Sequence, residues 1–129
     1  FAHLADSAEV VLVEGVGGWL APLSPTLEAN ALPQALDLPV ILVVGLRLGC
    51  LNHAQLTARA ILADGCTLLG WIGNAVDPAM DRRDDNLDTL RRLLPAPCLG
   101  VLDHAPGADE TPDLAAAVAA VAAICKPPR

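Results

Sequence analysis

Residues 38–46 read LPVILVVGL, and this stretch decides the fold predicted for the chain. It carries no charge before Arg47 and is rich in branched apolar side chains. The run is too short to cross a bilayer, which requires about 20 apolar residues. A strand that is apolar on both faces is typical of a parallel sheet covered by helices. We therefore predict a buried strand over residues 39–44, ended by Gly45, in an α/β protein.

Similar runs occur on both sides of this strand, and helical patterns alternate with them. Further strands are predicted over residues 10–13, 68–75 and 98–102, and helices over residues 52–63, 84–94 and from about 111 to 125, with a short helix near residues 27–36. Alternating strands and helices predict a parallel sheet with right-handed crossovers and helices on both faces. Ligands of such sheets bind at the carboxyl ends of the strands, so functional residues are expected there.

Three local signals mark the ends of the predicted helices. Asn52 and Gln55 have the spacing of a capping box, in which each side chain bonds the backbone of the first turn. Gly65 is suited to the left-handed residue that stops this helix. Residues 111–113, Thr-Pro-Asp, supply an N-cap followed by proline for the last helix.

The composition excludes several functional classes. Of the 129 residues 53% are hydrophobic and 18% are charged, which excludes a disordered chain. The net charge of −7 leaves no basic surface for nucleic acid. The absence of a long apolar run predicts no membrane partner. Four cysteines without C-x-x-C spacing predict reduced thiols and a cytoplasmic location; these are Cys50, Cys66, Cys98 and Cys125.

Glu14 follows the first predicted strand and precedes a glycine-rich segment, residues 15–18. A carboxylate at the tip of a buried strand is costly unless it faces a cation, a donor or water. In nucleotide-hydrolysing α/β proteins this position holds an acidic group near the magnesium ion. The glycines allow the backbone to approach a phosphate. The alternative interpretation is that Glu14 only caps a neighbouring loop.

Polar residues follow the other strands as well. Asn74 could read the edge of an adenine, since its amide both donates and accepts, or it could bond its own turn. Asp103 and His104 could line the same crevice or form a polar surface loop. Leu51 and Asn52 lie at a helix start whose free N–H groups favour an anion, although simple capping explains them too.

Four stretches together resemble the dethiobiotin synthetase family. They are residues 13–19 (VEGVGGW), 38–44 (LPVILVV), 47–53 (RLGCLNH) and 95–100 (PAPCLG). The resemblance implies a P-loop NTPase-like, Rossmann-like three-layer fold. It also implies an ATP-dependent ligase that closes the ureido ring of dethiobiotin from 7,8-diaminononanoate, CO2 and ATP, with Mg2+, in biotin biosynthesis.

The resemblance also implies roles for individual residues. The implied metal ligand is Glu14, and the implied nucleotide-binding residues are Glu14, Gly15, Val16, Gly17, Asn74, Ala75, Asp103, His104, Ala105 and Glu110. Leu51 and Asn52 would bind the substrate carboxylate across the interface of a homodimer. Family members often carry proline and an aromatic residue where this chain has Asp103 and His104.

The family's phosphate loop, lysines and early magnesium aspartate have no counterpart in this sequence. We therefore expect residues 1–129 to be the C-terminal portion of a single ATP-binding domain, incomplete at its N-terminus. Catalytic groups are expected upstream of Phe1, and the chain alone is expected to be inactive. Two alternatives are a non-catalytic binding or dimerisation module of the same fold and a related ATP-dependent amide-forming synthetase.

Overall fold

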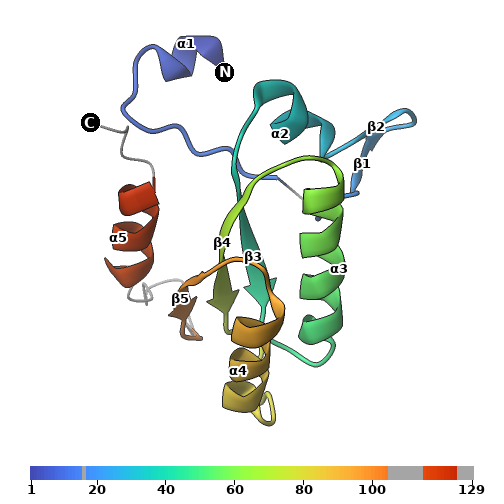
Figure 1. The fold of residues 1–129 in the computed structure, drawn as a ribbon, viewed down its shortest axis with the longest axis vertical. Helices are drawn as coiled ribbons and strands as arrows, with labels where there is room; N and C mark the ends of the chain where they lie inside the picture. The colour runs from blue at the N-terminus through green and yellow to red at the C-terminus, as the bar shows by residue number, and fades with distance from the viewer. Residues whose placement is uncertain (16, 105–114, 125–129) are drawn as a thin grey trace.

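A three-stranded parallel sheet forms the centre of the chain. The computed structural model describes residues 1–15, 17–104 and 115–124. In the sheet, β4 (Leu68–Asn74) lies between β3 (Val40–Gly45) and β5 (Cys98–Leu102), and all three run parallel (Figure 1). These are the strands predicted over residues 39–44, 68–75 and 98–102. The predicted α/β fold with a parallel sheet is confirmed.

Helices connect the strands and cover the sheet. α3 (Cys50–Ala63) joins β3 to β4, and α4 (Arg83–Leu93) joins β4 to β5. These two helices contact each other, while α5 (Ala115–Ile124) contacts β5. Figure 1 shows α5 on the side of β5 away from α3. The predicted start of this last helix at residues 111–113 and its predicted end at residue 125 lie outside the described residues.

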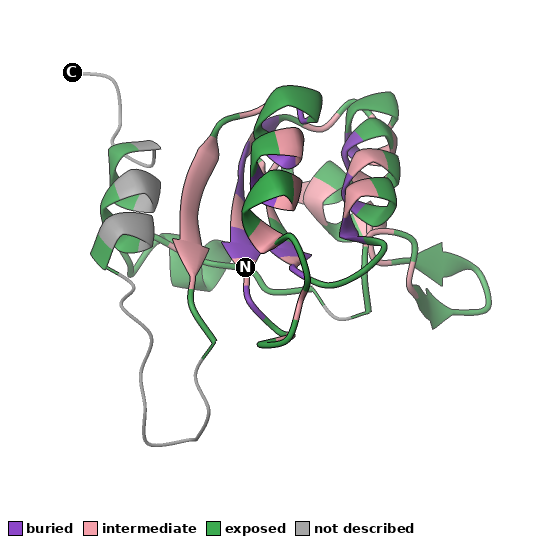
Figure 2. Cartoon of the chain, turned by 90° about the horizontal axis from the view of Figure 1, so that it is seen from below, coloured by how far each residue is buried: buried purple, intermediate pink, exposed green. Residues whose placement is uncertain are grey.

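The hydrophobic core lies between the sheet and the helices α3 and α4, where Figure 2 shows the buried residues. Trp71, Leu46, Ile61 and Leu90 are the largest fully buried side chains. Gly73 brings β4 close to this core, since a Cβ atom there would lie 3.4 Å from side-chain atoms of Leu46 and Leu87. A small residue in the strand thus lets the helices pack closely on it.

α3 begins at Cys50, two residues before the predicted start. Gly49 precedes it with φ of +93°, a conformation that favours glycine and turns the chain directly into the helix. Asn52 is therefore already within the helix and makes no side-chain cap bond. The Gln55 amide instead donates to the Leu51 carbonyl at 3.2 Å. The predicted capping box is wrong.

The end of α3 was predicted correctly. Gly65 has φ of +77°, and its N–H donates to the Leu62 carbonyl at 3.1 Å. The N–H of Cys66 donates to the Ile61 carbonyl, also at 3.1 Å. This pair of bonds is the Schellman arrangement, which satisfies the last carbonyls of a helix.

The predicted strand over residues 10–13 is wrong. Residues 10–15 form no strand, and within the described chain no segment pairs with them. Val10 and Leu12 are exposed, at 55% and 81%. An apolar, β-branched run forms a strand only when a neighbouring strand accepts its hydrogen bonds. The free edge of β3 does not supply that partner in this structure.

The segment before β3 contains small elements that the sequence patterns missed. α1 (Ala2–Ala5) opens the chain, and β1 (Pro22–Ser24) and β2 (Leu27–Glu28) form an exposed antiparallel hairpin. The short helix predicted near residues 27–36 is present only as α2 (Ala31–Leu36). Its first predicted residues belong to the hairpin instead.

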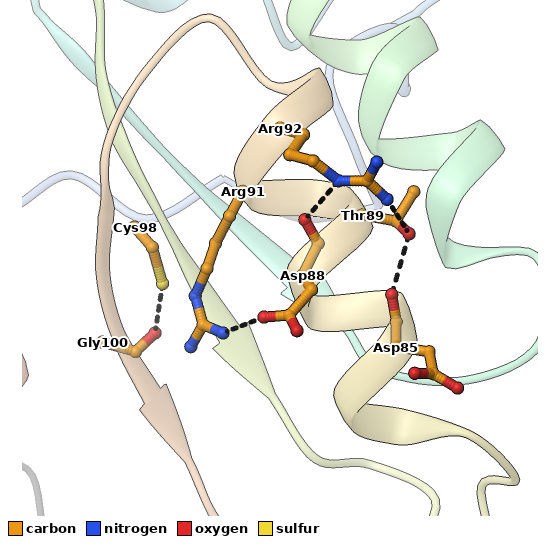
Figure 3. A network of polar contacts seen from close by, with 7 residues as sticks. All are labelled: Asp85, Asp88, Thr89, Arg91, Arg92, Cys98 and Gly100. Atoms are coloured by element: carbon orange, nitrogen blue, oxygen red, sulfur yellow. Dashed lines mark hydrogen bonds and ion pairs between the residues drawn. The ribbon is translucent and has the colours of Figure 1, made fainter.

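Most charged residues of α4 lie on its solvent-facing side, and Arg83 is the partly buried exception. Asp84 and Asp85 occupy the first turn and Arg91 and Arg92 the last, which suits the helix macrodipole. Figure 3 shows Arg91 paired with Asp88. Their Nη1 and Oδ1 atoms lie 2.8 Å apart, and the two side chains are 49% and 71% exposed. Exposed pairs of this kind contribute about 0–1 kcal/mol to stability.

None of the helices in the described ranges is long and apolar enough to cross a membrane.

The Asp64 carboxylate joins the segment before β3 to the end of α3. Its Oδ2 atom accepts hydrogen bonds from Asn30 Nδ2 at 2.8 Å and Trp19 Nε1 at 2.7 Å. The bond from Asn30, and then the one from Trp19, lowers the pKa of Asp64 from its ordinary value of 3.8, while desolvation opposes them. The ionised carboxylate is therefore the form that the fold prefers.

Asp64→Asn is expected to lower the melting temperature at neutral pH. Because the folded-state pKa is depressed, this stabilisation is present above pH 3.8 and is lost as pH falls through the folded-state pKa. Thermal unfolding followed by circular dichroism should show the gap between variant and wild type closing below pH 3.8. Asp81→Asn, at an exposed site, is the matched control and should show no gap. A gap for Asp64→Asn that does not change with pH would contradict this account.

Candidate functional site

The residues that follow β4 and β5 meet at the carboxyl edge of the sheet. The Ala75 N–H donates to the Leu102 carbonyl at 2.9 Å, which joins the two strand ends. His104 Nδ1 lies 3.1 Å from the Ala75 carbonyl oxygen. Since a carbonyl only accepts, Nδ1 must carry the proton in this contact, and in the neutral ring Nε2 is then an acceptor. His104 thus lies beside Ala75 at this edge of the sheet.

Hydrogen bonds hold the backbone carbonyl of Asn74, while its side-chain amide can still bind a ligand. Its carbonyl accepts from the N–H groups of Leu46 at 2.7 Å and Val76 at 2.9 Å. Its half-buried amide makes no hydrogen bond to any residue that the structure describes. The turn that follows is instead held by Asp77, whose Oδ1 accepts from the Ala79 N–H at 2.9 Å. Asn74 is therefore able to pair with the edge of a ligand.

Asp103 ties the end of β5 to the start of α4. Its Oδ1 atom lies 2.6 Å from Arg83 Nη2, and the Asp103 side chain is 83% exposed. Arg83 was not among the predicted site residues. One signal could have indicated it, because a cation in the first turn of a helix opposes the macrodipole and calls for an anionic partner.

A cavity of about 520 Å³ lies beside the end of β3 and the first turns of α3. Gly18, Gly45, Arg47, His53 and Val76 are among its lining residues. Leu51 packs against the core, and Asn52 is exposed on the same first turn. The backbone N–H groups of Leu51 and Asn52 have no acceptor in the part of the chain described. These N–H groups are the donors that favour an anion at a helix start.

The glycine-rich segment approaches the strand tips only at its end, where Gly18 lines the cavity beside β3. Figure 1 shows the stretch before Val16 near the amino-terminal ends of the strands, whereas the tips point the other way. Gly17 and Gly18 have φ of +83° and +108°, and Gly18 reaches the cavity beside β3. A Cβ atom at Gly17 would lie 3.0 Å from the Ala21 Cβ. Val16, Ala105 and Glu110 lie outside the described residues, so their roles stay predictions.

Glu14 supplies a carboxylate directly before the glycine-rich segment. Glu14 is exposed, and among the described residues no group of three or more His, Cys, Asp or Glu side chains could hold a metal ion. Mg2+ retains several waters and is typically bound by one or two carboxylates together with substrate phosphates. A single free carboxylate therefore fits a shared magnesium site, and it does not fit a site built by protein ligands alone.

Residues 1–111 match the family model of the AAA domain, a P-loop NTPase-like α/β fold. The chain belongs to this family, in agreement with its parallel sheet and its polar strand ends.

Curated relatives of the chain point to a narrower group within this class. The chain is 59% identical over 109 residues to the ATP-dependent dethiobiotin synthetase BioD of Xanthomonas euvesicatoria pv. vesicatoria (strain 85-10), covering 84% of this chain and 49% of the relative. It is 55% identical over 106 residues to the ATP-dependent dethiobiotin synthetase BioD of Xylella fastidiosa (strain 9a5c), covering 82% and 47%. The resemblance seen in the sequence is confirmed. The chain spans about half the length of the curated relatives it matches.

Proposed function

We propose that residues 1–129 are the C-terminal portion of the ATP-binding domain of a ligase that closes the ureido ring of dethiobiotin. Its substrates are 7,8-diaminononanoate, CO2 and ATP. The observation that supports this most strongly is the 59% identity to an ATP-dependent dethiobiotin synthetase. The alternative of a non-catalytic module accounts for the sheet but gives no reason for this degree of identity.

The base of ATP binds at the carboxyl ends of β4 and β5 in this proposal. The Asn74 amide can donate to and accept from an adenine edge, and Ala75 lies beside it on the chain. The Ala75 carbonyl holds His104 Nδ1, which leaves Nε2 as an acceptor. Asp103, Ala105 and Glu110 complete the base and ribose site.

The phosphates lie along the glycine-rich segment, beginning where Gly18 lines the cavity at the end of β3. Gly15, Val16 and Gly17 would contact them through the backbone, and Glu14 would be the ligand of a bound Mg2+. When bound, Mg2+ neutralises the charge of the phosphates and of the transferring phosphoryl group. The chain contributes position and charge here, because phosphoryl transfer depends mainly on these two effects.

The diamine substrate binds through its carboxylate at the start of α3. The N–H groups of Leu51 and Asn52, which have no acceptor among the described residues, are the donors, helped by the positive end of the helix dipole. The enzyme acts as a homodimer in the cytoplasm, with this helix start near the dimer interface. Reduced thiols suit that location, and Cys50, Cys66 and Cys98 are free in the structure.

Asn52→Ala in the intact protein tests the substrate assignment. The exposed Asn52 side-chain amide is a further donor beside the backbone N–H groups, and losing its hydrogen bond to the charged carboxylate is expected to raise the KM for 7,8-diaminononanoate about tenfold. The Kd for ATP should stay within about twofold, because the base and phosphates bind elsewhere. Steady-state kinetics with each substrate varied in turn measures the difference.

Arg59→Ala, on an exposed position further along α3, is the matched control and should change neither constant. If Asn52→Ala left the diamine KM unchanged, or weakened ATP equally, the assignment would fail. An intact enzyme that turns over ATP with a different acid and amine, and not with this diamine, would favour a related amide-forming synthetase.

A further inference from the structure

The segment after β5 is held at two points that lie on different elements. Arg83 Nη2 contacts Asp103 Oδ1 at 2.6 Å, across 20 positions of sequence. The next residue, His104, contacts the carbonyl of Ala75 at 3.1 Å. One point fixes this segment to α4 and the other to the end of β4. The Arg83–Asp103 ion pair and the His104–Ala75 contact together hold the His104 ring in place.

Arg83 differs from the other arginines of α4. Its side chain is 35% exposed, and its Nε atom is buried with no hydrogen-bond partner in the described structure. Arg91, by contrast, pairs with Asp88 within one turn of the same helix and lies in solvent (Figure 3). The Arg91 pair can only affect α4 locally. The Arg83 pair connects α4 to a segment of the nucleotide site.

We propose that Arg83 is a positioning residue for the base end of the nucleotide site. It holds Asp103, and thereby keeps His104 on the Ala75 carbonyl, beside the free amide of Asn74. The inference rests on the proposed function, because it assumes that a nucleotide base binds at these strand ends.

The contact also predicts which base is preferred. With Nδ1 donating to Ala75, the neutral His104 ring can only accept at Nε2. Adenine presents an amino group at its C6 edge, which can donate to such an acceptor. Guanine presents an oxygen there, which cannot. A correctly placed His104 therefore favours ATP over GTP, and a displaced one loses that preference.

The test measures the Kd of ATP, GTP and inorganic tripolyphosphate for the intact protein by calorimetry. Arg83→Gln and Asp103→Asn are each expected to weaken ATP about two- to fivefold, the range for partly exposed ion pairs. The double variant should be no worse than Asp103→Asn alone, since Arg83 acts only through Asp103. GTP and tripolyphosphate should be unaffected, so the ratio of ATP to GTP affinity falls.

Two further variants separate positioning from a general loss of structure. The charge-reversed pair, Arg83→Asp with Asp103→Arg, should bind ATP more tightly than Asp103→Arg alone, because the ion pair is restored. Arg91→Gln, which removes the other ion pair of α4, should change nothing.

Three results would overturn the inference. In the first, ATP affinity is unchanged in Arg83→Gln, and the proposed function then stands without it. In the second, all three ligands weaken equally, which indicates only a structural role. In the third, the wild-type protein fails to bind ATP, and the proposed function falls together with the inference.

Discussion

Glu14→Gln is expected to lower the ATP-dependent turnover of the intact protein by on the order of 100-fold, the loss typical when one preorganised electrostatic contact to reacting groups is removed. Glutamine has nearly the same shape and keeps one carbonyl oxygen, but it lacks the charge that holds Mg2+. Phosphate release at saturating ATP, measured over a series of Mg2+ concentrations, is the appropriate assay. The variant should also require more Mg2+ for half-maximal rate.

Glu9→Gln provides the matched control, because Glu9 is also exposed and lies five positions earlier in the same segment. It should retain full turnover and the wild-type Mg2+ requirement. If Glu14→Gln kept more than half of the wild-type rate at low Mg2+, Glu14 would not be a metal ligand. The alternative noted from the sequence, a loop-capping role, would then be preferred.

Trp71→Ala is expected to destabilise the protein by about 3–5 kcal/mol, the usual cost of truncating a fully buried aromatic residue. Trp71 is 0% exposed in the middle of β4 and belongs to the core that joins the sheet to α3 and α4. Alanine would leave a cavity that the neighbouring strands cannot close without moving. Urea unfolding followed by circular dichroism gives the free energy.

Trp71→Phe is the informative comparison for this prediction. Phenylalanine keeps most of the buried ring, and it removes the indole Nε1, which is buried without a partner in the described structure. Its cost should therefore be well below that of alanine, about 1.5 kcal/mol or less. Equal losses for the two variants would show that the site does not depend on filling this volume.

The central strands could be predicted from the sequence because burial leaves a local signal. The apolar runs of β3, β4 and β5 can be recognised without knowledge of their partners, although Val43 of β3 is 58% exposed. Residues 10–13 carry the same signal and form no strand, because pairing depends on another segment. The hairpin of β1 and β2 is short and exposed, so its sequence has no burial pattern to detect.

The candidate site was predictable to the extent that it depends on topology. Parallel strands place their carboxyl ends at one edge, which brings Asn74 and Ala75 close to Asp103 and His104. Arg83 was missed because its contact with Asp103 crosses 20 positions and depends on how α4 lies on the sheet. The start of α3 was missed because the left-handed turn at Gly49 replaces the side-chain cap that Asn52 seemed suited to provide.

The most direct test of the account is the release of phosphate from ATP by the intact protein, with and without 7,8-diaminononanoate, in the presence of bicarbonate and Mg2+. The account predicts release that depends on the diamine, requires Mg2+ and is accompanied by formation of the cyclic urea. Phosphate release that is independent of the diamine, or no release under any of these conditions, would contradict it.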